Sequence, residues 1–232
     1  MCETVTGGIR SESRWLRDSL FAISGIYTPL GEGRYLYYGE RPSKTWYGHG
    51  YFSKSLTVLR GGHPEKIELY KHRWEDQETG ATTHSRPPDD PAYVGCSSLI
   101  IVLRIWAVIN SEKGFYNREE VYPGLWEGCG SNRTVQRWTQ RAFANSIEIQ
   151  QAIRRYLIDK SEPRPAERLF VGGLSPPDGV EKRRWKSSTK LKELYRAYAM
   201  LLVASRELAQ HASCLLAGAR RRMPKQTKTF GL

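Results

Sequence analysis

The spacing of hydrophobic residues changes once along the chain, near residue 97. Between residues 33 and 75, apolar and polar positions alternate in short runs rich in Tyr, Trp and β-branched residues, and Gly and Pro separate the runs. Alternation with a period of two is typical of strands that bury one face, so this region predicts a small antiparallel sheet. After residue 97 the segments have the length and the capping signals of helices. The expected fold class is therefore α+β.

Four helices are expected between the sheet and residue 160. The first covers residues 97–110 and begins with a serine that can cap it. The second covers residues 117–122 and begins with the capping box NREE. The third and fourth cover residues 131–144 and 146–159. We expect these helices to form one bundle.

A fifth, long helix is expected over residues 187–222. Apolar or small residues recur in it at spacings of three and four from Leu191 to Ala219, which is the pattern of a seam that packs on another helix. Two partners for this seam are open: a second copy of the chain in a homodimer, or the chain's own helix over residues 146–159. Pro224 ends the helix, and a basic tail follows it.

The charge of the chain indicates a class of binding partner. Lys and Arg total 36 against 24 Asp and Glu, which gives a net charge of +12. Such an excess favours a polyanionic partner, either nucleic acid or an anionic surface. Residues 181–232 alone carry thirteen basic and three acidic residues, which predicts a basic element at the C-terminus.

Three of the expected helices match the layout of a helix-turn-helix, with a support, a positioning and a recognition helix. In the expected recognition helix, Val135, Trp138 and Ala142 share one face that can pack on the support helix. Arginine can bond guanine in bidentate fashion, glutamine can bond adenine, and either can hold a backbone phosphate. The opposite face, which we predict to bind duplex DNA, carries Arg133, Gln136, Arg137, Gln140 and Arg141.

Further phosphate contacts are expected from basic residues near the C-terminus. Seven are assigned this role: Lys182, Arg183, Arg184, Arg220, Arg221, Arg222 and Lys225. If about five phosphates are neutralised, log affinity falls against log salt with a slope of about −4.5.

Two other functions remain open beside DNA binding. The same charge, with exposed Tyr and Trp on the strands, suits an RNA-binding or ribonucleoprotein subunit that stacks bases. The basic helical face is also compatible with a protein-interaction scaffold that binds no nucleic acid. No catalytic constellation is recognised, and the pair Asp89-Asp90 is expected to be a solvated lead-in to a helix. Neither an enzymatic activity nor a cofactor is therefore predicted.

The order of these features resembles transposase-like proteins that join a zinc ribbon to a helix-turn-helix. The resemblance covers about residues 33–145, through the motifs YLYYG, Trp46, HGY, Arg73-Trp74, Thr82-Thr83 and Pro87-Pro88. The four expected thiolate positions of the ribbon hold Tyr35, Tyr38, Asp76 and Thr79. Because thiolates dominate closed zinc sites, the resemblance implies a degenerate, metal-free ribbon in which the two tyrosines replace the metal with buried aromatic area. It also implies a mobile-element or regulatory role.

These expectations divide the chain into six segments. They are an N-terminal segment (1–32), a β-rich ribbon-like module (33–90), a helix-turn-helix bundle (91–160), a Pro/Gly linker (161–180), a long basic helix (181–222) and a basic tail (223–232). The four cysteines form no CxxC pair, so neither a disulfide framework nor an intact zinc site is expected. Without a signal-peptide core or an apolar run that spans a bilayer, the expected localisation is cytoplasmic and nucleoid-associated, with no membrane partner.

Overall fold

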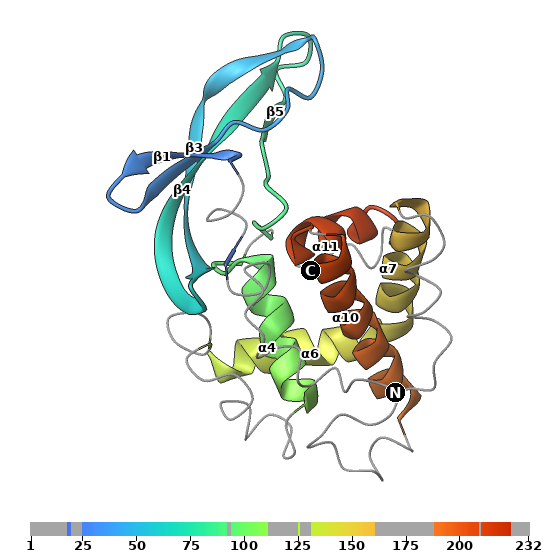
Figure 1. Ribbon diagram of the computed structural model, residues 1–232. Helices are drawn as coiled ribbons and strands as arrows, with labels where there is room; N and C mark the ends of the chain where they lie inside the picture. The colour runs from blue at the N-terminus through green and yellow to red at the C-terminus, as the bar shows by residue number, and fades with distance from the viewer. Residues whose placement is uncertain are drawn as a thin grey trace.

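The protein consists of a β-sheet and a bundle of helices that meet near one end of the sheet (Figure 1). This computed structural model describes residues 18–19, 25–91, 94–110, 125, 131–160, 188–208 and 210–223. The expected α+β class is confirmed. None of the helices in these ranges has a stretch that is both apolar and long enough to cross a lipid bilayer.

Five strands form the sheet: β1 (Tyr27–Gly31), β2 (Arg34–Tyr37), β3 (Trp46–Arg60), β4 (His63–Asp76) and β5 (Thr82–His84). The order is β1-β2-β4-β3, and β5 also pairs with β4. Only the β2–β4 pair is parallel, so the expected antiparallel character holds for the other pairs. The first strand lies before residue 33, where the alternating pattern begins, so the sheet starts earlier than the sequence predicted.

The long β3–β4 hairpin gives the sheet a buried face. Its two-residue turn is Gly61-Gly62, with φ of 59° and 85°, a conformation that suits glycine at both positions. Leu56 pairs with Ile67 and therefore points to the same side of the sheet. Both side chains are buried, together with Tyr27, Val58 and Leu69, and Cys214 of the bundle packs against this cluster.

Within the described residues, five helices form the bundle: α4 (Ser98–Asn110), α6 (Asn132–Ala144), α7 (Ser146–Lys160), α10 (Thr189–Glu207) and α11 (Ala212–Arg220). Helix α4 is its centre, because residues 98–109 are all buried. Even Arg104 is fully buried, and its Nε and Nη2 donate to the carbonyl oxygen of Leu125 at 3.0 and 2.8 Å. A central helix that is buried all round explains why its sequence shows little polar periodicity.

The prediction of one long helix over residues 187–222 is wrong, because the structure divides this segment into α10 and α11. The Ser205 hydroxyl donates to the carbonyl of Gln210 at 2.7 Å, and the chain turns there. His211 then caps α11, since its Nδ1 accepts a hydrogen bond from the amide of Ser213 at 3.0 Å. The break is not visible in the apolar spacing, which continues through it.

The seam of the expected long helix is buried within the chain. Leu191, Leu194, Tyr198 and Leu215 share one hydrophobic cluster with Ile153 and other residues of α7. Helices α11 and α7 also approach closely, since a β-carbon at Gly218 would lie 2.2 Å from the ring of Tyr156. Of the two partners left open, the structure therefore shows the chain's own helix over residues 146–159, and the seam is not available to a second copy.

The positions equivalent to the zinc-ribbon ligands do not come together. Tyr35 lies opposite Leu69 on β4, whereas Asp76 is seven residues further along the same strand, a distance of about 23 Å at 3.3 Å per residue. Tyr38 is 53% exposed. The expectation that Tyr35 and Tyr38 form a buried aromatic substitute for a metal is therefore wrong.

The cysteines depart from expectation at one position. Cys96 is buried and disulfide-bonded, although the spacing of the cysteines indicated no disulfide. Cys214 is a free thiol. The other two cysteines lie outside the described residues, as do the expected positioning helix at 117–122 and the Pro/Gly linker.

Candidate functional site

Helix α6 begins and ends where its sequence predicts. Ser131 is the N-cap, and its Oγ accepts a hydrogen bond from the amide of Thr134 at 3.3 Å. At the other end the amide of Asn145 donates to the carbonyl of Arg141, and α7 starts at the next residue. A capped start and a one-residue connection hold the helix at both ends, so its orientation on the bundle is set by the backbone as well as by packing.

One face of α6 packs on the bundle. Val135, Thr139 and Ala142 are buried, and Trp138 is half-buried against the main hydrophobic cluster. Thr139 satisfies its hydroxyl by donating to the carbonyl of Val135 at 2.9 Å. The helix also contacts α4, the predicted support helix. The predicted buried face of the third helix is therefore confirmed.

The opposite face of α6 is solvent-exposed and carries no acidic residue. Its three arginines are four residues apart, so they form a line about 12 Å long on one side of the helix, with the two glutamines beside it. In the described part of the chain, no carboxylate is within ion-pair distance of these arginines. All five predicted side chains are exposed: Arg133, Gln136, Arg137, Gln140 and Arg141.

The basic residues predicted near the C-terminus differ in their exposure and in the contacts that they make. Arg222 forms a salt bridge with Asp159 of α7, with Nη2 and Oδ2 2.6 Å apart, and its guanidinium lies 4.8 Å from the centre of the Tyr156 ring. Arg220 is half-buried, and Arg221 is exposed. Lys182, Arg183, Arg184 and Lys225 lie outside the described residues.

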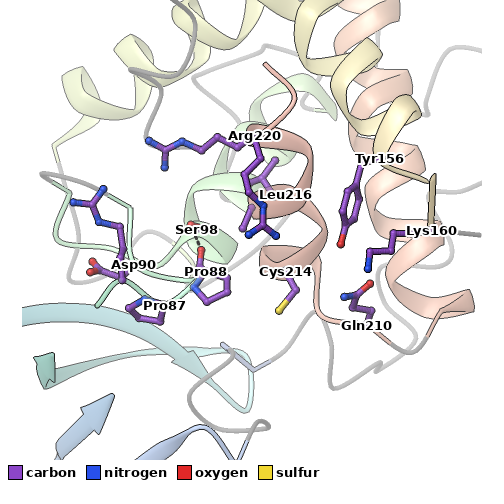
Figure 2. Close-up of a pocket in the computed structure, with 13 residues that line it drawn as sticks. Pro87, Pro88, Asp90, Ser98, Tyr156, Lys160, Gln210, Cys214, Leu216 and Arg220 are labelled. Atoms are coloured by element: carbon purple, nitrogen blue, oxygen red, sulfur yellow. Dashed lines mark hydrogen bonds between the residues drawn. The ribbon is translucent and has the colours of Figure 1, made fainter. Parts of the chain in front are cut away.

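A cavity of about 550 Å³ lies between the β5–α4 connection, the C-terminal end of α7 and helix α11 (Figure 2). Four basic side chains line it, from Arg86, Lys160, Arg220 and Arg221. We call it the basic pocket. The pKa of Arg220 is lowered, first by burial and then by the positive charge of Arg86. The two guanidinium groups are therefore close enough to repel each other.

A buried group of charges adjoins the basic pocket, at the junction of sheet and bundle. Asp90, with a side chain only 1% exposed, accepts hydrogen bonds from Lys54 and from Lys71, the latter at 2.6 Å between Oδ2 and Nζ. Burial lowers the pKa of Lys71, and the interaction with Asp90 opposes this shift. The buried carboxylate is thus neutralised by two strand lysines.

The neighbouring carboxylate joins three parts of the chain. Asp89 is buried, its Oδ1 accepts from the Ser213 hydroxyl at 2.7 Å, and the same oxygen lies 3.4 Å from the amide of Leu99 at the start of α4. Burial, and then the charge of Asp89, raises the pKa of Cys214 to about 11, so this thiol is protonated at neutral pH.

The expectation of a solvated Asp89-Asp90 pair is therefore wrong, although Asp89 does lead into a helix. Proline-rich turns are usually exposed, and for this reason the sequence favoured a solvated pair. A signal was present on the strands: Lys54 and Lys71 occupy the same alternating positions as the buried Leu56 and Leu69. A lysine on a buried face needs an acidic partner, but the pattern does not show which one.

Exposed aromatic residues lie at the end of the β3–β4 hairpin that carries the bulge near Gly48. The ring of His72 is 4.1 Å from that of Trp74, 5.5 Å from Tyr51 and 6.0 Å from Tyr38, measured between centroids. Tyr51 is 54% exposed and Tyr38 is 53% exposed. We call Tyr38, Tyr51, His72 and Trp74 the aromatic cluster.

Comparisons with known proteins add no family to these observations. No protein-family model matches the chain, and neither a curated protein nor a solved structure shows significant similarity to it.

Proposed function

We propose that the protein binds duplex DNA through the exposed face of α6. The observation that carries this proposal is the row of three arginines and two glutamines on one face of a helix that is anchored by the other. An α-helix fits the major groove of B-DNA, and these side chains can contact base edges and phosphates. The helix is preformed, so binding does not require its folding.

The charge of α6 and of the whole chain supports a positively charged contact surface. The helix contains only basic and neutral side chains, and the chain as a whole has a net charge of +12. Such a charge attracts a polyanion and raises the rate of encounter. The resemblance to transposase-like proteins suggests that the site serves a mobile element or a regulatory process, and this role is part of the proposal.

Replacing Arg133, Arg137 and Arg141 with alanine is expected to lower the affinity for a mixed-sequence duplex at least about tenfold at low salt. Each arginine that contacts a phosphate contributes about 0.9 to the slope of log affinity against log salt, so the slope becomes less steep by up to about 2.7. Fluorescence anisotropy at several salt concentrations measures both quantities.

A matched control separates this face from net charge alone. Lys44, Lys66 and Arg73 are exposed residues of the sheet region, and their replacement with alanine removes the same charge. The control variant is expected to keep the salt slope of the wild-type protein. Equal losses in the two triple variants would contradict a specific role for α6.

The second candidate function is binding of single-stranded nucleic acid, favoured by the exposed rings of Tyr38 and Tyr51 in the aromatic cluster. Bases stack on such rings with little sequence preference, at about 1 to 3 kcal/mol per base. Tyr38→Ala with Tyr51→Ala is expected to weaken binding of a single-stranded oligonucleotide about tenfold or more and to leave duplex binding unchanged. Competition between duplex DNA and single-stranded RNA measures this, and unchanged single-strand affinity would exclude the cluster as a stacking surface.

A further inference from the structure

The basic pocket is a concave site built from three separate parts of the chain. Its walls come from the connection before α4, from α7 and from α11, and Figure 2 shows side chains of all three around it. Its volume of about 550 Å³ is in the usual range for sites of small ligands, which is roughly 300 to 1,000 Å³. The pocket is therefore large enough for an organic molecule as well as for a simple ion.

The charge of the lining is strongly positive. Its four basic side chains face one carboxylate, that of Asp90, which is already paired with Lys54 and Lys71. Of two acids on the neighbouring segments, Asp159 forms a salt bridge with Arg222, whereas Asp89 accepts a hydrogen bond from the neutral Ser213 hydroxyl. An anion in the pocket would thus meet several cations, and the one carboxylate of the lining is already paired with two lysines.

Arg86 and Arg220 line the pocket from two different segments. These two side chains come from the β5–α4 connection and from α11, and the charge of the first lowers the pKa of the second. Arginine side chains in such a lining can give an anion charge-assisted hydrogen bonds. Lys160, at the end of α7, adds a third cation on the side where the Tyr156 hydroxyl and Gln210 lie (Figure 2).

The remainder of the lining is mainly apolar. Pro87, Pro88, Leu216 and Ala217 are part of the wall and offer no charge. We propose that the basic pocket binds a small organic phosphate of mononucleotide size, with the phosphate among the basic side chains of the lining and the organic part against the apolar wall. The site does not include α6, so this proposal is independent of DNA binding.

Isothermal titration calorimetry of the full chain tests the proposal with two probes, inorganic phosphate and adenosine monophosphate. We expect the nucleotide to bind more tightly than phosphate alone. Arg220→Gln is expected to lower the affinity for the nucleotide about tenfold or more, because it removes a charge-assisted contact. Arg86→Gln is expected to have a similar effect, and since Arg86 is exposed, this variant retains the fold if Arg220→Gln does not.

The control variant is Arg133→Gln, which removes the same charge from α6, outside the pocket. It is expected to bind the nucleotide as the wild-type protein does. The proposal is overturned if neither probe binds at millimolar concentration, if phosphate binds as tightly as the nucleotide, or if Arg133→Gln weakens binding as much as Arg86→Gln. Duplex binding measured in the same variants reports on α6 separately.

Discussion

Replacing Asp90 with alanine is expected to destabilise the protein by about 3 to 5 kcal/mol. Removal of one partner from a buried ion pair leaves the other charge desolvated and unpaired, which is the origin of a loss of this size. Here the remaining charge is chiefly that of Lys71, whose side chain is 3% exposed, while Lys54 is nearer to solvent at 17%. Urea unfolding at pH 7, followed by circular dichroism, measures the change in the free energy of unfolding.

Two further variants identify the cause of that loss. Asp159→Ala breaks a salt bridge that is partly exposed to solvent and should cost less than about 1 kcal/mol. The double variant Asp90→Leu with Lys71→Met removes both buried charges and should recover most of the stability lost in Asp90→Ala. If Asp90→Ala costs no more than Asp159→Ala, the buried pair does not stabilise the junction between sheet and bundle.

Replacing Trp106 with alanine is expected to cost about 3 to 5 kcal/mol as well, through loss of packing. Trp106 lies on the central helix α4 and is 1% exposed. Its ring stacks on that of Tyr195 from α10, with centroids 5.0 Å apart and planes at 20°. Because a domain of this kind is stable by only about 5 to 15 kcal/mol, the variant loses a large part of its stability. Thermal unfolding measured by circular dichroism should show a clear fall in Tm.

Ile158→Ala provides the control for this prediction. Ile158 lies on α7, but its side chain is 51% exposed, so the change is expected to stay within about 0.5 kcal/mol. A double-mutant cycle with Tyr195→Ala isolates the ring contact, which should contribute about 0.5 to 1.5 kcal/mol beyond the buried area. A Trp106→Ala protein as stable as the Ile158→Ala protein would show that α4 is not the centre of the core.

The sequence determined the elements whose signals are local. The cap at Ser131 and the apolar spacing of Val135, Trp138 and Ala142 predicted α6 to within one residue of the observed helix, together with its exposed polar face. The alternation along β3 and β4 predicted strands in the same way. Capping and facial periodicity depend on residues within a few positions of one another, so they can be read along the chain.

Only the tertiary structure decided which residues meet at the junction and in the pocket. The break before His211 was hidden because α10 and α11 both bury their apolar residues in the same core, so the spacing continues across it. The contacts of Asp89 and Asp90 reach Lys54, Lys71 and Ser213, up to 124 positions away. Whether a carboxylate is solvated or buried beside a lysine depends on what the folded chain places around it, and no local pattern contains that information.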